Sequence, residues 1–254
     1  MCEYVELIKS FCIDLEIKEP KQLADFCFSE DKFTKSRKYA KYKKNPDPDN
    51  MEIVKCIYMV LWGNQFKNLE SIDDIGPWGR NIRKNYRGDT MNSYNSIEKM
   101  ITNPDYYTLK LLETYKKNYH RIGNFILIPN RGNINSQKGS TKPKGFVQDS
   151  FDIFLYAMKE EYKGKWISKI CYGDNILDYF GEDNKPKYYD KMKEFFIEDY
   201  FDKAGEPIQL LINNDYTGWL ERVNNIIDDR SEKISKKLFK MMPDLNNFES
   251  KEIL

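Results

Sequence analysis

The chain's single histidine, His120, stands just before Gly123-Asn124 and is the side chain best suited to acid–base chemistry. An imidazole has a pKa near neutral pH, so it can take a proton from a water molecule that attacks a phosphodiester. Asn124 and Asn135 are neutral amides that can orient reacting groups or bind Mg²⁺ beside it. We therefore expect His120, Asn124 and Asn135 to be catalytic; a structural or capping role for a histidine near a helix end is the alternative.

Two basic clusters can supply the phosphate contacts that this chemistry needs. The loop from residue 130 to 144 combines cations with glycines that allow the backbone to approach a ligand closely. Earlier in the chain, arginines lie around Trp78, a composition that can stack bases. The expected phosphate-binding residues are Arg131, Lys138, Lys142, Arg80 and Arg83. The alternatives are an ordinary solvated loop and a tryptophan packed under an arginine-rich surface.

The order of elements around the loop also favours an anion. The apolar run Phe125–Ile128 stops at Pro129 and predicts a short strand, and an amphipathic helix is predicted from about Gln148 to Tyr162. A strand, a glycine-bearing loop and a helix N-terminus together direct backbone N–H groups toward one place. This arrangement suits a phosphate group, either in a nucleotide or in a nucleic-acid backbone.

Composition narrows the class of protein. The 254 residues carry 41 basic and 40 acidic side chains, a net charge of +1, so only a local patch can favour nucleic acid. No apolar run is long enough to cross a bilayer, and the acidic N-terminal stretch does not look like a secretory signal. We expect a cytoplasmic protein with no membrane partner, whose five cysteines stay reduced and inert. Walker and Rossmann nucleotide motifs are absent.

Periodic apolar spacing predicts helices along most of the chain. They cover residues 3–17, 20–28, 51–62, 105–119, 148–162, 187–200 and 216–241. Asp49 or Asn50 is the expected N-cap of the third helix. The fourth is expected to bury Leu109, Leu111, Leu112 and Tyr115, and residues 208–212 to form a short buried strand or part of a helix.

These elements predict a mainly α (α+β) fold, a single helical domain over residues 1–254 with a small β element near residues 122–134. In it, an N-terminal helical part (1–62) packs on a central strand–loop–helix unit (119–163). A C-terminal helical part (166–241) completes the domain.

Several short motifs are similar to those of a bacterial family of intracellular proteins of this size. That family carries a D-P-D turn before a helix that ends in L-W, then I-G-N, an apolar run to a proline, an N-x-I-N-x-x-x-G loop and a D-x-F-D-L helix. The matching residues are Asp47-Pro48-Asp49, Leu61-Trp62, Ile122-Gly123-Asn124, Pro129, Asn133-Ile134-Asn135, Gly139 and Asp149-Ser150-Phe151-Asp152-Ile153. The likeness spans about residues 45 to 202 and brings no known activity with it.

A shorter stretch resembles the C-terminal HNH-type nuclease region of Gmr-like modification-dependent restriction enzymes. There, G-N-L-x-L is followed by an asparagine and a lysine. Gly123-Asn124-Phe125-Ile126-Leu127, Asn133 or Asn135, and Lys138 look like that pattern. In such nucleases a catalytic histidine lies upstream on a hairpin that helps to bind the metal, whereas this chain has only His120 beside the G-N pair. The resemblance implies a metal-dependent phosphodiester hydrolase, or a degenerate one that only binds.

Two functions are therefore expected. The first is a nuclease-like hydrolase acting on nucleic acid or nucleotides, in phage defence or a toxin-like role, with Mg²⁺ as the candidate cofactor. The alternative is a noncatalytic module: either one that binds a nucleotide or nucleic acid through the same loop, or a helical protein-interaction partner in which the loop is only surface.

Overall fold

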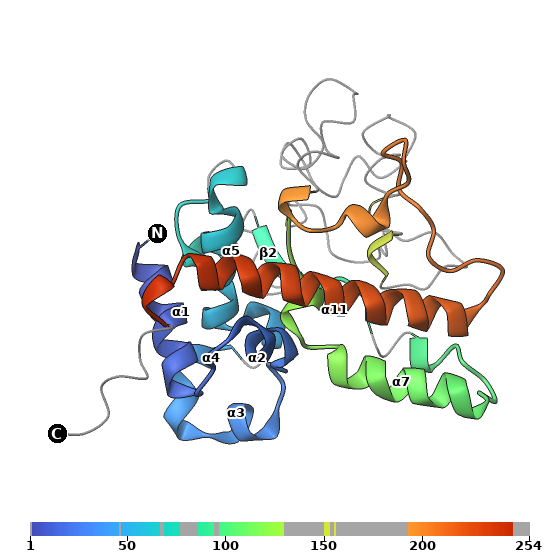
Figure 1. The fold of residues 1–254 in the computed structure, drawn as a ribbon, viewed down its shortest axis with the longest axis horizontal. Helices are drawn as coiled ribbons and strands as arrows, with labels where there is room; N and C mark the ends of the chain where they lie inside the picture. The colour runs from blue at the N-terminus through green and yellow to red at the C-terminus, as the bar shows by residue number, and fades with distance from the viewer. Residues whose placement is uncertain are drawn as a thin grey trace.

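The computed structural model describes residues 2–45, 47–66, 69–76, 86–93, 97–129, 150–152, 155 and 193–245. This part of the chain is mainly α-helical with one small sheet, so the expected fold class is confirmed (Figure 1). Its buried side chains form one hydrophobic cluster that draws on the N-terminal, central and C-terminal thirds. Among the described residues, every helix is too short or too polar to span a bilayer.

The N-terminal part is built on two helices that pack together, α1 (Cys2–Asp14) and α5 (Glu52–Trp62). Helix α5 is apolar on nearly all sides, so it lies inside the protein, and Gly63 ends it as expected. The expected N-cap of α5 is wrong. Met51 holds that position with no side-chain cap, because Asp49 and Asn50 are buried elsewhere.

Short elements connect these two helices and follow them. They are α2 (Pro20–Asp25), α3 (Asp31–Lys35), η1 (Arg37–Tyr39), α4 (Ala40–Lys43), η2 (Pro48–Asn50), η3 (Gly63–Gln65) and η4 (Ile72–Asp74). Helix α2 begins where the sequence predicts, because Pro20 fixes its first turn and the Gln22 side chain accepts a hydrogen bond of 3.1 Å from the Glu19 N–H.

The sheet has three strands, β1 (Ile75–Gly76), β2 (Tyr86–Thr90) and β3 (Phe125–Pro129), in that order. Strand β3 is the predicted strand, whereas β1 and β2 were not predicted. Strand β2 pairs parallel with β1 and antiparallel with β3, with Tyr86 opposite Pro129 and Thr90 opposite Phe125. It escapes prediction because its sequence is polar and contains a glycine.

Two further helices cross the C-terminal half, α7 (Tyr106–Asn118) and α11 (Tyr216–Lys240). Asp105 caps α7 through a 2.7 Å bond from Thr108 N–H, and Asp215 caps α11 through a 2.9 Å bond from Gly218 N–H. Figure 1 shows α11 running along the molecule, and it packs against both α2 and α7. Its predicted apolar stripe is buried as expected: Trp219, Leu220, Val223, Ile226, Ile227, Ile234 and Leu238.

Burial on α7 differs from the prediction. Tyr115 is fully buried, but Leu111 and Leu112 are only half-buried and Leu109 is 44% exposed. The helix rests on α11 through a narrow stripe, where Thr108 hydrogen-bonds Thr217 at 2.7 Å. A stripe that narrow leaves the neighbouring leucines in water.

Two predictions near the C-terminus are corrected. The predicted helix to residue 200 is wrong. Phe196 has a φ of 56°, which a right-handed helix cannot contain, so no helix continues from there into the short turn η7 (Glu198–Tyr200). Residues 208–212 form neither strand nor helix, although Leu210 and Leu211 are buried. The predicted helix 148–162 lies mostly outside the described residues; within it, Phe151 and Leu155 are buried.

Candidate functional site

The turn η5 (Ile122–Asn124) lies between α7 and β3, shortly after His120, and contains Asn124. The buried guanidinium of Arg230, on α11, donates to the carbonyl oxygens of Gly123 at 2.7 Å and Phe125 at 2.6 Å. Ser231 accepts the N–H of Gly123 at 2.9 Å. A Cβ on Gly123 would overlap the Ile227 carbonyl oxygen, so only glycine lets the turn lie this close to α11.

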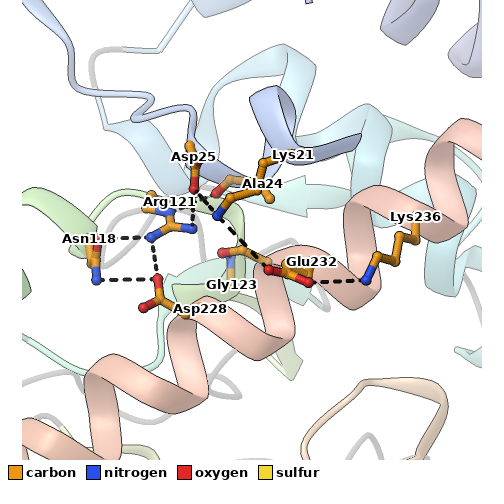
Figure 2. Close-up of polar contacts among 10 residues, drawn as sticks. Lys21, Ala24, Asp25, Asn118, Arg121, Gly123, Asp228, Glu232 and Lys236 are labelled. Atoms are coloured by element: carbon orange, nitrogen blue, oxygen red, sulfur yellow. Dashed lines mark hydrogen bonds and ion pairs between the residues drawn. The ribbon is translucent and has the colours of Figure 1, made fainter. Parts of the chain in front are cut away.

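Arg121 fixes the chain between His120 and this turn. Figure 2 shows its guanidinium between Asn118, Asp25 and Asp228, which come from α7, α2 and α11. It donates to the Ala24 carbonyl oxygen at 2.7 Å and pairs with Asp25 at 3.0 Å and with Asp228. Arg121 and Arg230 therefore anchor the backbone that directly follows the candidate base, at residues 121, 123 and 125.

Asn124, a predicted catalytic residue, is fully buried and its amide is completely hydrogen-bonded. The side-chain oxygen accepts from the N–H and the side-chain amide of Asn92, at 3.1 and 3.4 Å. The amide nitrogen donates to the carbonyl oxygens of Asn92 at 3.1 Å and Tyr119 at 2.8 Å. In this arrangement Asn124 ties the end of β2 to the residue before His120.

The imidazole of His120 is half-buried between two rings, Tyr119 at 4.3 Å and Phe125 at 6.4 Å between centroids. Burial lowers the pKa of His120 to about 4, and the carboxylate of Asp47 opposes this shift. The ring is therefore neutral at pH 7. No described residue makes a hydrogen bond to it, so its unprotonated nitrogen can accept one from a ligand, whereas burial makes the ring a weaker base.

A group of carboxyls gathers at η2 and β2, and one of them, Asp47, acts on the His120 ring. The turn η2 brings Asp49 against strand β2, where it is 6% exposed. Burial raises the pKa of the Asp49 carboxyl well above its usual range, and the neighbouring carboxylates of Asp89 and Asp47 raise it further. Asp89, unlike Asp49, forms an ion pair with an arginine, Arg87, at 2.8 Å.

Gly88 makes this approach possible. A Cβ at this position would overlap the main-chain oxygen of Asp49 and lie 2.8 Å from a ring carbon of Tyr58. The amide of Asn50 donates to the Gly88 carbonyl oxygen at 3.3 Å and to the Asp49 carboxyl at 2.8 Å. The D-P-D-N turn and the middle of β2 thus fit together only because residue 88 has no side chain.

The side chains gathered here are of types that can transfer protons. They comprise a neutral imidazole, a buried carboxyl that favours its protonated form and a carboxylate paired with an arginine. Such divergent pKa values within one cluster are typical of acid–base sites. Within the described residues, no group of three His, Cys, Asp or Glu side chains is arranged to hold a metal ion. A role for Mg²⁺ stays a prediction.

The other predicted site residues cannot be placed. Asn135, Arg131, Lys138, Lys142, Arg80 and Arg83 lie outside the described residues. Tyr86 and Pro129 face each other at one end of the β2–β3 pair. Of the two ends of this pair, that one is nearer in sequence to both basic clusters. His120 lies beside Phe125 at the opposite end, about 13 Å away along a five-residue strand.

Asp49, Asp89 and Gly88 are site residues that sequence reasoning missed. By its sequence, the D-P-D motif indicates only a turn and a possible helix N-cap. Asp49 and Asp89 stand forty positions apart, and nothing in their local sequence indicates that they meet. A Gly-Asp pair inside a short polar strand was the one available signal, because glycine in a strand often marks close backbone approach.

Two of the cysteines behave as expected. Cys12 and Cys56 are buried free thiols, and burial raises the pKa of each to about 12, so neither is a nucleophile at neutral pH. Cys171 lies outside the described residues.

Comparison with known proteins identifies no relative: no protein family, curated protein or solved structure matches the chain. The two resemblances in the motifs stay predictions.

Proposed function

We propose that this protein acts on a phosphodiester in nucleic acid or a nucleotide, with His120 as the general base, in a defence or toxin-like role. The observation that supports this most directly is the state of the imidazole. It is neutral at pH 7, its backbone is followed directly by a stretch that Arg121 and Arg230 anchor, and it has no hydrogen bond to a described residue.

In this proposal, His120 takes a proton from the attacking water while the carboxyl cluster provides a proton source nearby. Asn124 supports the base through the Tyr119 carbonyl. The basic residues Arg131, Lys138 and Lys142 would bind the phosphate, as their composition suggests.

The test is a cleavage assay with plasmid DNA, RNA and single-stranded DNA, in Mg²⁺ and separately in Mn²⁺. Loss of the base is expected to lower the rate of cleavage by 10²- to 10⁴-fold in His120→Ala. The matched control is Tyr216→Ala, which removes a half-buried ring from the first turn of α11. Cleavage by His120→Ala at the wild-type rate would reject His120 as the base, and absence of cleavage of every substrate by the wild type would reject this function.

The second candidate is a noncatalytic module that binds nucleotide, nucleic acid or protein. One observation favours it: all four hydrogen-bonding positions of the Asn124 amide are used within the protein. An amide in that state does not orient a substrate unless those bonds break.

A binding experiment separates the two candidates. Fluorescent DNA and RNA oligonucleotides are titrated at several salt concentrations, without metal and with EDTA. The module predicts salt-sensitive binding without cleavage, and a salt slope lower by about 0.7 to 0.9 in Arg131→Ala or Lys138→Ala. Lys236→Ala, an exposed lysine that pairs with Glu232 at 3.0 Å, is the control. Absence of salt-sensitive binding to either oligonucleotide rejects a nucleic-acid module.

A further inference from the structure

The segment from residue 32 to 44 carries seven lysines and arginines and no acidic residue. The whole chain has a net charge of only +1, so this is a strong local concentration of positive charge. The segment contains η1, α4 and most of α3, and it lies beside α1 (Figure 1). We call its exposed cations the basic surface.

Three aromatic side chains turn these cations toward solvent. Phe33, Tyr39 and Tyr42 are buried, and the Tyr42 hydroxyl donates to the Asp14 carboxylate of α1 at 2.7 Å. The Tyr42 ring also packs edge-on against Phe11, at 5.2 Å between centroids. Six of the seven cations are left exposed: Lys32, Lys35, Arg37, Lys38, Lys41 and Lys44.

Half of these exposed cations are available to a ligand. Lys32, Arg37 and Lys38 form no ion pair with any described residue, and Lys38 reaches only the main-chain oxygen of Asp14, at 3.5 Å. The other three lysines each pair with a carboxylate at 2.6 to 3.0 Å and are at least 56% exposed. Exposed pairs of this kind add little stability, so these lysines can exchange a carboxylate for a phosphate.

The burial of the aromatic rings indicates which polyanion fits. A single strand is held by bases that stack on exposed rings, and a membrane surface by apolar side chains that enter it. In residues 32–44 the only aromatic rings are Phe33, Tyr39 and Tyr42, and all three are buried. The basic surface therefore offers charge without stacking, which suits the regularly spaced phosphates of a double helix.

Both ends of the segment lead to the candidate site. Before α3, the N–H of Phe28 donates to the carbonyl oxygen of His120 at 3.0 Å, and the Phe28 ring lies 5.6 Å from that of Phe125. After α4, Asp47 is the carboxylate that acts on the His120 ring. The chain that carries the basic surface thus leaves the candidate base at one end and returns to it at the other.

We propose that the basic surface binds the phosphate backbone of a double-stranded nucleic acid, with Lys32, Arg37 and Lys38 as its principal contacts. Binding through phosphates is independent of base sequence. A role in presenting the duplex to His120 rests on the proposed function, whereas binding itself does not.

The experiment measures binding without cleavage, in EDTA, over a range of salt concentrations. Fluorescent DNA and RNA duplexes, their single strands and anionic lipid vesicles are titrated with the wild type and with a triple variant, Lys32→Gln, Arg37→Gln and Lys38→Gln. We expect the wild type to bind duplexes more tightly than single strands or vesicles. In the triple variant the salt slope for the duplex should fall by about 2 to 3, because three phosphate contacts are lost.

Two further triple variants serve as controls. Lys110→Gln, Lys117→Gln and Lys240→Gln remove the same charge from exposed positions outside the basic surface and should leave the slope unchanged. Lys32→Arg, Arg37→Lys and Lys38→Arg keep the charge and should bind duplexes as the wild type does. Weak binding by this charge-conserving variant would show that the three side chains act through the fold and would overturn the proposal.

The other outcomes also decide the matter. An unchanged slope in the glutamine variant at residues 32, 37 and 38, tighter binding to single strands, or binding to vesicles alone would overturn the basic surface. Its failure differs from failure of the proposed function. A wild type that binds duplexes through the basic surface but cleaves no substrate rejects the proposed hydrolase and leaves the basic surface standing.

Discussion

The guanidinium of Arg230 donates a hydrogen bond of 2.7 Å to the carbonyl oxygen of Gly123, across 107 residues of sequence. The same group lies 5.5 Å from the ring centroid of Trp62, and its Nε donates to the Phe195 carbonyl oxygen at 3.1 Å. One buried cation therefore joins α5, η5, α11 and the segment before η7, and it is only 1% exposed.

Replacing Arg230 by methionine should destabilise the protein severely. Methionine fills much of the space but leaves the carbonyl oxygens of Gly123, Phe125 and Phe195 without their donor. We expect a loss of about 3 to 5 kcal/mol in the free energy of unfolding, measured by urea denaturation. The control Lys233→Met removes an exposed pair with Asp199 at 3.8 Å and should cost less than about 1 kcal/mol.

Replacing the two partners of the Arg121–Asp228 ion pair should lower the free energy of unfolding by different amounts. Arg121→Met should cost about 2 to 4 kcal/mol, because it leaves the Ala24 carbonyl oxygen and Asn118 without a buried donor. Asp228→Asn should cost less than about 1 kcal/mol, because that side chain is 48% exposed and solvent replaces its contact. Equal losses from the two variants in urea denaturation would show that the ion pair itself, and not the carbonyl bond, provides the stability.

Gly88 should tolerate no side chain, whereas Gly63 should. A methyl group at residue 88 overlaps the Asp49 main chain, so Gly88→Ala should cost at least about 2 kcal/mol. At residue 63 the nearest atom to an added Cβ is Met59 Cε at 3.4 Å, and the backbone is helical. Gly63→Ala should therefore change stability by less than about 1 kcal/mol. Thermal melts of both variants decide this, and a stable Gly88→Ala would contradict the observed packing of η2.

The protonation of His120 can be read directly, because a single histidine gives a single imidazole signal in the NMR spectrum. We expect that signal to titrate near pH 4 and not near about 6.5, owing to burial. The folded protein then binds fewer protons than the unfolded chain between these values, so stability falls as pH drops from about 6.5 to 4. His120→Phe keeps the ring and should remove this dependence. A titration at pH 6.5 would mean that the imidazole is freely solvated.

Long periodic elements were predictable and contacts between distant residues were not. Helix α11 follows from seven apolar positions at helical spacing, and β3 from an apolar run that ends at a proline. Strand β2 could not be predicted, because its sequence is polar and its strand form depends on pairing with β3 and contact with the turn η2, both distant in sequence. Leu109 fits the helical period of α7, yet it is exposed, because spacing does not report how wide a stripe the neighbouring helix covers.

The candidate site likewise has one residue that the sequence identifies and several contacts that it does not. His120 could be selected by chemical type alone, since the chain has one histidine. Its low pKa comes from burial, and its neighbour Asp47 stands more than seventy positions earlier. The close approach of the Asp49 main chain to β2 depends on Gly88, which only the folded chain reveals.

The position of Arg230 on α11 also affects the order in which the molecule can be assembled. The elements from α1 to β3 are synthesised earlier, yet the carbonyl groups of η5 find their buried donor only when α11 docks. Until then those carbonyl groups must bond to water, and the β2–β3 strand pair lacks the hydrogen bond that Arg230 donates to Phe125. A contact this distant in sequence makes folding slow. A fragment that stops before α11 should therefore remain loosely structured, however complete its own helices are.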